Sequence, residues 1–156
     1  MTPPDNKAVA CGKRISPFSI TASSSETAVR QALKEFLAAL DELNLDTDEL
    51  GTIELVLAET LNNIVEHAYP QTQTSGPIEL NCRHQTDGLH IEIRDNGAEM
   101  PDGKLPPGML APIEGPEDDL PEGGFGWFLI QHLAKDLVYT RLEDENLLKL
   151  RLAVGL

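Results

Sequence analysis

The chain has 156 residues, a length typical of one domain that buries roughly 70% of the surface exposed by its unfolded form. Lys and Arg number 12 against 26 Asp and Glu, which gives a formal net charge of -14 at pH 7. This charge repels nucleic-acid phosphates and anionic lipid, so it argues against direct binding to nucleic acid or to a membrane.

Residues 1–14 are polar and irregular, and we expect them to form a disordered leader ahead of one domain at 15–156. The leader lacks the apolar stretch of a signal peptide, and no segment approaches the ~18 consecutive apolar residues of a membrane span. Cys11 and Cys82 stand outside any CxxC pair, which is typical of reduced thiols in a cytoplasmic protein. The histidines do not have the spacing of a zinc site: His67, His84, His90 and His132.

The first predicted elements are an edge strand and a helix. The stretch ISPFSITA, residues 15–22, favours a strand at the edge of a sheet, where Pro17 is tolerated. Ser23 and Glu26 have the S-x-x-E spacing of a capping box, which predicts a helix start. This helix carries an apolar stripe at helical period: Val29, Leu33, Phe36, Leu37, Leu40 and Leu43.

A second helix is predicted to begin near Asp46 or Thr47 and to stop at Pro70. On it Glu59, Asn63 and His67 are four residues apart, so their side chains are expected on one face. A solvated helix face is the plain interpretation of such a line. The amide oxygen of the asparagine would also suit Mg²⁺, and the glutamate would suit a base. The apolar positions of this helix are Leu50, Ile53, Leu57, Leu61, Ile64 and Ala68.

From residue 78 the hydrophobic period changes to two, and the runs IELNCRH and LHIEIRD predict a hairpin with its turn at Asp87-Gly88. Asp95 ends the second run, where a carboxylate could accept a hydrogen bond from an exocyclic amine. Gly97 would leave room for a flat ring against the backbone. An ordinary Asp-Asn-Gly turn is the alternative. The residues of the second run expected to face the core are Leu89, Ile91 and Ile93.

A 26-residue stretch with six prolines and no clear period runs from Gly97 to Glu122. Structureless segments longer than ~12–15 residues inside a compact domain are usually functional lids or disordered insertions. The position of this stretch, between a strand end and a glycine-rich loop, favours a lid over a ligand. A surface insertion is the alternative.

The stretch EGGFGWFLIQ, residues 122–131, places three glycines where a third helix is predicted to begin. Glycine loses more backbone freedom on ordering than any other residue, so it is an unfavourable choice at a helix start. The presence of Gly123, Gly124 and Gly126 there therefore calls for an explanation. Without Cβ atoms, the unpaired N–H groups of a first helical turn can approach a phosphate closely. A flexible turn is the alternative. Because the net charge repels nucleotide, a phosphate here would need a divalent cation such as Mg²⁺.

The third helix carries Phe128, Leu129 and Leu133, with Leu137 in line, and Trp127 is expected to pack in its first turn. LVYTRL and LLKLRLAV then predict a final hairpin around the acidic turn EDEN. The order of strand, helix, helix, hairpin, loop, helix, hairpin predicts an α/β (α+β) fold, a two-layer sandwich. In it, three helices cover one face of a mixed, mainly antiparallel sheet.

Three short motifs follow one another along these elements: E-x-x-x-N at 59–63, D-x-G at 95–97 and G-x-G-x-x-L at 124–129. Together they resemble the N, G1 and G2 boxes of the GHKL ATPase superfamily, whose domain is the histidine kinase-like, or Bergerat, fold. Within this superfamily, the segments EHAYP, GGFG and DLVYTR look most like those of the anti-sigma factor serine kinases. The likeness covers residues 15–153. The resemblance implies ATP and Mg²⁺ as cofactors and an ATP lid at 98–122.

The resemblance also implies a role for each motif residue. Asn63 would coordinate Mg²⁺, Asp95 would read the adenine amino group, and Glu59 would orient or deprotonate an incoming hydroxyl. The implied reaction is phosphorylation of a serine or threonine of an antagonist protein, which controls the release of a sigma factor. Relatives often pair, so a homodimer is left open. The residues that would bind the nucleotide are Asn63, His67, Asp95, Gly97, Gly123, Gly124, Phe125, Gly126 and Leu129.

One departure concerns the charge ahead of the glycines. Many relatives carry a basic residue there, and an arginine on a transferring phosphoryl group is worth ~10³ or more in rate. The lid of this chain has Lys104 as its only cation. A non-catalytic, nucleotide-dependent partner-switching module is therefore the alternative function, and a nucleotide-independent interaction protein is a third. The acidic residues ahead of the glycines are Glu117, Asp118, Asp119 and Glu122.

Overall fold

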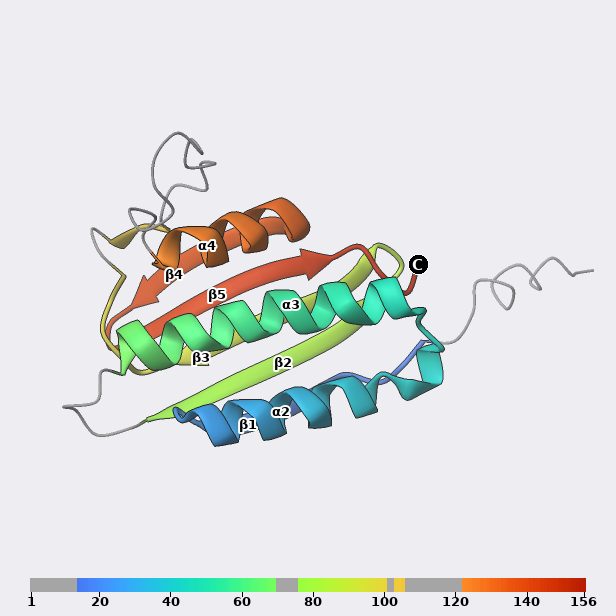
Figure 1. The fold of residues 1–156 in the computed structure, drawn as a ribbon, viewed down its shortest axis with the longest axis horizontal. Coiled ribbons are helices and arrows are strands. Elements are labelled where there is room, and N and C mark those ends of the chain that lie inside the picture. Colours follow the sequence, from blue (N-terminus) through green and yellow to red (C-terminus); the bar gives the residue numbers. More distant parts are fainter. Residues whose placement is uncertain (1–13, 70–75, 101–102, 106–121) are drawn as a thin grey trace, which may run out of the picture.

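The structure is a computed structural model that describes residues 14–69, 76–100, 103–105 and 122–156. Along these residues the elements follow the predicted order of strand, helix, helix, hairpin, helix and hairpin (Figure 1). The predicted leader and most of the predicted lid lie outside the described residues, so both stay predictions.

The sheet contains five described strands in the order β1-β2-β3-β5-β4. All four described strand pairs are antiparallel, so these strands contain no parallel pair of the kind that a mixed sheet would have. β1 lies at the edge, as Pro17 predicts, because a proline just outside the strand removes no donor from the ladder. The strands are β1 Phe18–Ser23, β2 Pro77–Gln85, β3 Gly88–Asp95, β4 Lys135–Leu142 and β5 Glu145–Leu152.

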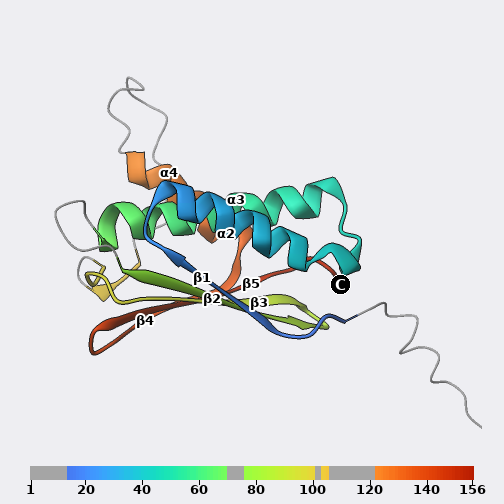
Figure 2. The same cartoon turned by 90° about the horizontal axis from the view of Figure 1, so that it is seen from below.

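The α-helices of the described residues are α2 Glu26–Ala39, α3 Thr47–Asn63 and α4 Glu122–Leu133. The 3-10 turn η1, Asp41–Leu43, follows α2, and the π-helix η2, Ile64–Ala68, follows α3. Figure 2 shows the helices on one side of the sheet and the other side of the sheet uncovered. The predicted α+β two-layer sandwich is confirmed.

The core lies between the helices and the sheet. The predicted inward residues of β3 are at most 1% exposed, since every second side chain of a strand points to the same face. Cys82 faces this core from β2, and burial raises the pKa of its thiol to about 12. The apolar stripes of α2 and α3 supply the opposite wall, whose fully buried members include Phe36, Leu40, Ile53, Leu57 and Leu61.

The helix starts depend on side chains that pair with free backbone groups. At the start of α3, Asp46 accepts from Glu49 N at 2.8 Å and Glu49 accepts from Asp46 N at 3.2 Å, which confirms the predicted start. The predicted cap of α2 at Ser23 is wrong, because Ser23 stays in the ladder between β1 and β2. Ser25 caps α2 instead and accepts from Ala28 N at 3.1 Å.

Three boundaries near the last elements differ from the prediction. The glycines predicted to form a loop lie inside α4, which begins at Glu122. Leu137, predicted in line with the third helix, belongs to β4. The last hairpin turns over two residues rather than four, so Asn146 of the EDEN stretch lies in β5. In that strand Asn146 is the partner of Asp95 on β3.

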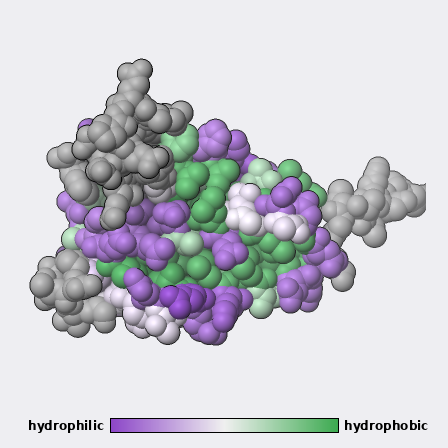
Figure 3. All heavy atoms as spheres, in the orientation of Figure 1, coloured by the Kyte–Doolittle hydropathy of each residue, from purple (hydrophilic) through white to green (hydrophobic). Residues whose placement is uncertain are grey.

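Figure 3 shows the helix face of the molecule. Hydrophilic residues cover the outer sides of the helices, and hydrophobic residues show in the band between α3 and α2. No helix in the described parts of the chain is long and apolar enough to cross a membrane. The large apolar side chains that are exposed among the described residues are Leu55, Val138, Leu142 and Leu156.

Candidate functional site

The three predicted motifs meet at one end of the molecule. Figure 1 shows the C-terminal end of α3, the N-terminal end of α4 and the C-terminal end of β3 together at that end. These ends carry residues 59–63, 124–129 and 95–97, respectively. The fold therefore gathers motifs that are far apart in the sequence.

Helices α3 and α4 approach each other through a glycine. A Cβ atom built on Gly126 would lie 2.6 Å from Glu59 Oε2 and 3.6 Å from Asn63 Nδ2. Real Cβ atoms essentially never lie within 3.0 Å of another heavy atom, so glycine is what allows this approach to the Glu59 carboxylate. The predicted base and the predicted metal ligand thus both face the glycine of the third motif.

Asn63 carries an unpaired polar atom in the interior. The residue is 9% exposed, and its Nδ2 has no hydrogen-bond partner among the described residues. An unpaired buried donor costs about 1–3 kcal/mol, which suggests that a group from outside the chain binds here. Turning the carboxamide over would present Oδ1 at the same place, and Mg²⁺ accepts such a carbonyl oxygen. The position therefore fits the metal role that the sequence predicts.

His67 lies away from this contact. The α-helix ends at Asn63, and η2 continues the chain with π geometry, which pairs residues five apart. A spacing of four therefore aligns Glu59 with Asn63 but no longer aligns Asn63 with His67. The His67 side chain is 64% exposed, and its Nε2 lies 3.8 Å from Glu66 Oε2.

Asp95 is a buried carboxylate at the end of β3, with 5% of its surface exposed. Its Oδ1 accepts hydrogen bonds from Asn146 Nδ2 at 2.8 Å and from Gly97 N at 2.9 Å. Burial raises the pKa of Asp95, and the bonds from Asn146 and Gly97 and the nearby Arg141 offset this rise in part. Among the described residues, Oδ2 accepts no hydrogen bond.

Gly97 docks the second motif onto the end of η2. A Cβ atom built on Gly97 would lie 2.5 Å from Ala68 O, and Ala98 N donates to the same oxygen at 2.9 Å. Tyr69, which follows η2, accepts from Asn96 N at 2.5 Å. The segment after β3 is thus held by the chain that continues the helix of the first motif.

The last hairpin supplies a network around Asp95 that the sequence analysis missed. Asn146 is 5% exposed and donates to Ala98 O at 2.8 Å as well as to Asp95. Its Oδ1 accepts from Tyr139 OH at 2.5 Å and from Arg141 Nη1 at 3.1 Å. The word DLVYTR contains the tyrosine and the arginine, but no local pattern distinguishes the asparagine from an ordinary turn residue.

The first turns of α4 hold the rest of the third motif. Gly123, Gly124 and Phe125 lie within α4, and Leu129 is partly buried. Trp127 is 5% exposed and belongs to the hydrophobic core, as predicted. Because the first N–H groups of a helix have no partner within it, this end of α4 suits an anion.

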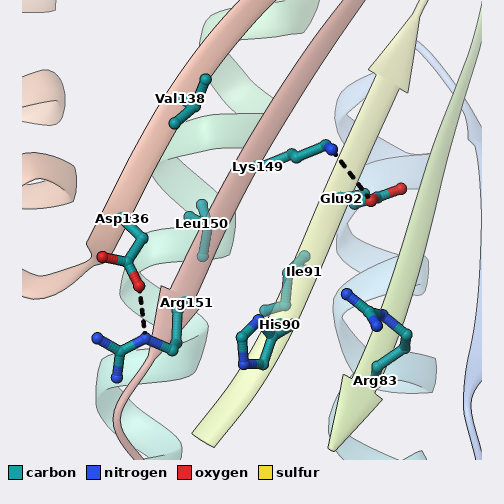
Figure 4. Close-up of a pocket in the computed structure, with 9 residues that line it drawn as sticks. All are labelled: Arg83, His90, Ile91, Glu92, Asp136, Val138, Lys149, Leu150 and Arg151. Carbon is teal, nitrogen blue, oxygen red and sulfur yellow. Dashed lines mark hydrogen bonds and ion pairs between the residues drawn. The ribbon is translucent and has the colours of Figure 1, made fainter. Parts of the chain in front are cut away.

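A separate groove of about 190 Å³ lies on the uncovered face of the sheet (Figure 4). Across it, Lys149 Nζ lies 3.8 Å from Glu92 Oε1, and Arg151 Nε donates to Asp136 Oδ2 at 2.8 Å. None of the predicted site residues lines this groove, so it is not the place of the predicted chemistry. The lining residues are Arg83, His90, Ile91, Glu92, Asp136, Val138, Lys149, Leu150 and Arg151.

The gathered motifs and the sandwich define a class of protein. Residues 22–152 match the family described as the histidine kinase-like ATPase domain, and the chain belongs to that family. Its relatives include the serine-protein kinase RsbW of Halalkalibacterium halodurans, which is 35% identical over 60% of this chain and 56% of the relative. The anti-sigma F factor of Geobacillus stearothermophilus is 24% identical over 74% and 75%. The serine/threonine-protein kinase BtrW of Bordetella bronchiseptica is 35% identical over 64% and 67%.

A solved structure supports the fold. The RsbU and RsbW domains of a Mycobacterium tuberculosis protein give a TM-score of 0.61 at 17% identity, over 88% of this chain and 32% of that chain. The matched regions span between 56% and 75% of the lengths of the three relatives named above. Family membership therefore applies to this domain, and the activity of the whole protein is a separate question.

Proposed function

We propose that this chain is an ATP-binding anti-sigma regulatory factor that phosphorylates a serine or threonine of an antagonist protein and so controls the release of a sigma factor. The observation that carries the proposal is the close approach of Gly126 to Glu59, with Asn63 beside the same position. A carboxylate, a metal-binding amide and a helix start that accepts phosphate are the groups that a phosphoryl transfer to a hydroxyl needs.

The proposed cofactors are ATP and Mg²⁺. Asn63 would hold the metal ion, because one atom of its buried carboxamide, placed as Nδ2, lacks a partner among the described residues and could equally be the oxygen. When bound, Mg-ATP supplies the phosphoryl group, and its cation neutralises phosphate charge that a chain of net charge -14 would otherwise repel. The backbone N–H groups at the start of α4, around Gly123, Gly124 and Gly126, would bind the phosphates.

The residues of the first two motifs would then perform three tasks. Glu59 would orient the partner's hydroxyl and accept its proton, from a position set by the contact with Gly126. Asp95 would accept a hydrogen bond from the adenine amine, and Gly97 would keep the backbone clear of the ring. Nucleotide-binding roles for His67, Phe125 and Leu129 belong to the same proposal.

The proposed partners are a sigma factor and the antagonist protein. The relative named anti-sigma F factor supports the first, and the relatives named serine-protein kinase support a protein substrate. Nucleic acid and membrane are not proposed as direct partners, because the acidic chain repels both. A homodimer is left open, and a measurement of the molecular mass in solution decides it.

Two measurements test the proposal. Thermal unfolding with and without Mg-ATP should show stabilisation of the wild type, and the Asn63→Ala variant should lose most of it. Labelled ATP should transfer phosphate to a serine or threonine of the antagonist, and Glu59→Gln should abolish the transfer. Glu54→Gln makes the same change at an exposed position of α3 and should leave transfer intact. A Glu59→Gln variant as active as the wild type would refute the catalytic role.

The second candidate is a non-catalytic, nucleotide-dependent partner-switching module. It is favoured by the five carboxylates and the absence of Lys and Arg in the sequence from 105 to 122. The transferring phosphoryl group would then lack a basic residue ahead of the glycines, of the kind that raises the rate of phosphoryl transfer. Stabilisation by Mg-ATP and binding of the antagonist without any transfer of label would establish this alternative.

A further inference from the structure

The orientation of the Asn146 side chain is determined by its neighbours. Arg141 can only donate hydrogen bonds, so the atom of Asn146 that faces Arg141 Nη1 at 3.1 Å must be the oxygen. The Tyr139 hydroxyl, which accepts from Met100 N at 3.1 Å, donates its proton to the same Asn146 Oδ1. The amide nitrogen is thereby directed to Asp95.

This orientation leaves Asp95 with one acceptor atom occupied and one free. Oδ1 already receives hydrogen bonds from Asn146 Nδ2 at 2.8 Å and from Gly97 N at 2.9 Å. Oδ2 accepts none from the described residues. The two donors also favour the ionised carboxylate, which is a pure acceptor. The free oxygen is therefore suited to a ligand that donates, such as an exocyclic amine.

The same amide fixes the backbone beside the carboxylate. Asn146 Nδ2 donates to Ala98 O at 2.8 Å, and Arg141 Nη1 donates to Gly97 O at 2.7 Å. The hairpin of β4 and β5 thus holds both Asp95 and the glycine segment that would lie against a flat ring. Asn146 is the central residue of this network. Its loss would therefore free both the Asp95 carboxylate and the glycine segment.

We propose that Asn146 is a positioning residue that gives the site its preference for a purine bearing a 6-amino group over one bearing a 6-oxo group. The proposal rests on the function proposed above, and it adds to the recognition of the amine by Asp95 a residue that the motifs do not contain. Asn146 acts through Asp95 rather than on the ligand itself. Without the Asn146 side chain, the Asp95 carboxylate can rotate and accept from other donors. The 6-amino group of the purine then loses its oriented acceptor.

The experiment compares the affinities of Mg-ATP and Mg-ITP by calorimetry, since ITP carries an oxo group in place of the amine. The wild type should bind ATP roughly 10- to 100-fold more tightly, the range expected for a hydrogen bond to a charged acceptor. In Asn146→Ala the ratio of the two affinities should fall to about threefold or less, which is within the spread of values measured for a typical hydrogen bond. ITP affinity should fall less than ATP affinity, because ITP has no amine for Asp95 to bind and the proposed triphosphate contacts lie on other elements.

Two further variants keep the test decisive. Asn81→Ala removes an asparagine from β2 on the uncovered face and should retain the wild-type ratio. Tyr139→Phe removes one of the two donors that orient Asn146 and should give an intermediate ratio, so it decides the matter if Asn146→Ala does not fold.

Equal losses of ATP and ITP affinity in Asn146→Ala would mean a merely structural role and would overturn the proposal. An unchanged ratio in both Asn146→Ala and Tyr139→Phe would do the same. A wild type that binds both nucleotides equally would overturn this inference alone. A wild type that binds neither would also overturn the proposed function.

Discussion

Gly126→Ala should separate the stability of the domain from its chemistry. The new Cβ would start 2.6 Å from Glu59 Oε2, whereas carbon contacts are comfortable at about 3.5 Å, so the carboxylate must move by roughly 1 Å. A displacement of about 1 Å can cost ~10²-fold in rate, so phosphoryl transfer should fall by that order. The nearest atom belongs to a half-buried, flexible side chain, which can move without disturbing the backbone.

The effect of this substitution on stability should be small. Replacing glycine by alanine inside a helix is worth about 1 kcal/mol, and the displaced carboxylate costs an amount of similar size. The melting temperature should therefore stay within about 2–4 °C of the wild type, the shift expected per kcal/mol for a domain of this length. The assay pairs thermal unfolding with transfer of label to the antagonist protein.

Gly51→Ala is the matched control for this prediction. Gly51 lies in α3, and a Cβ atom there would meet nothing within 4 Å. This variant should gain about 1 kcal/mol from helix propensity alone and should transfer phosphate normally. If Gly126→Ala showed the same gain together with wild-type transfer, the contact between α4 and Glu59 would not limit the reaction, and the reasoning would be refuted.

Three other predictions concern the C-terminal end of β3 and the core. Gly97→Ala should destabilise the domain by about 1–3 kcal/mol, measured by urea unfolding, because its Cβ would lie 2.5 Å from the Ala68 backbone oxygen, which cannot turn aside. Burial raises the pKa of Asp95 in the folded state, so its contribution to stability is present below the unfolded pKa and is lost as pH rises through the folded pKa. The melting temperature of Asp95→Asn should therefore be no lower than that of the wild type at neutral pH, and any excess over the wild type should disappear in acid. The variant should also bind ATP at least ~10-fold more weakly. In a Cys11→Ser background, Cys82 should resist thiol reagents until the domain unfolds, since its pKa is about 12 and it is 1% exposed.

Each of these outcomes has a clear opposite. A Gly97→Ala variant as stable as the wild type would mean that the second motif does not dock tightly on η2. Melting of Asp95→Asn well below the wild type at pH 7 would mean that the ionised carboxylate stabilises the fold. Rapid labelling of Cys82 in the native protein would mean that β2 opens without global unfolding.

Local patterns in the sequence determined the elements and the candidate residues. The change of hydrophobic period from 3.6 to two separated helices from strands, because each period matches the geometry of one backbone. The start of α3 was predicted near Asp46 or Thr47, and the structure places it there with a capping box between Asp46 and Glu49, which forms within four residues. The order of the three motifs identified the family, since it needs no knowledge of how the helices pack.

The tertiary structure alone decided how those residues meet. The contact of Gly126 with Glu59 depends on how α4 packs against α3, which no local period contains. Ser23 failed as a cap because strand pairing with β2 competed for it. Asn146 became a partner of Asp95 because the last turn is two residues long and the register of β5 on β3 sets the pairing. Contacts between distant segments follow from packing and register, so the sequence predicted the members of the site but not their connections.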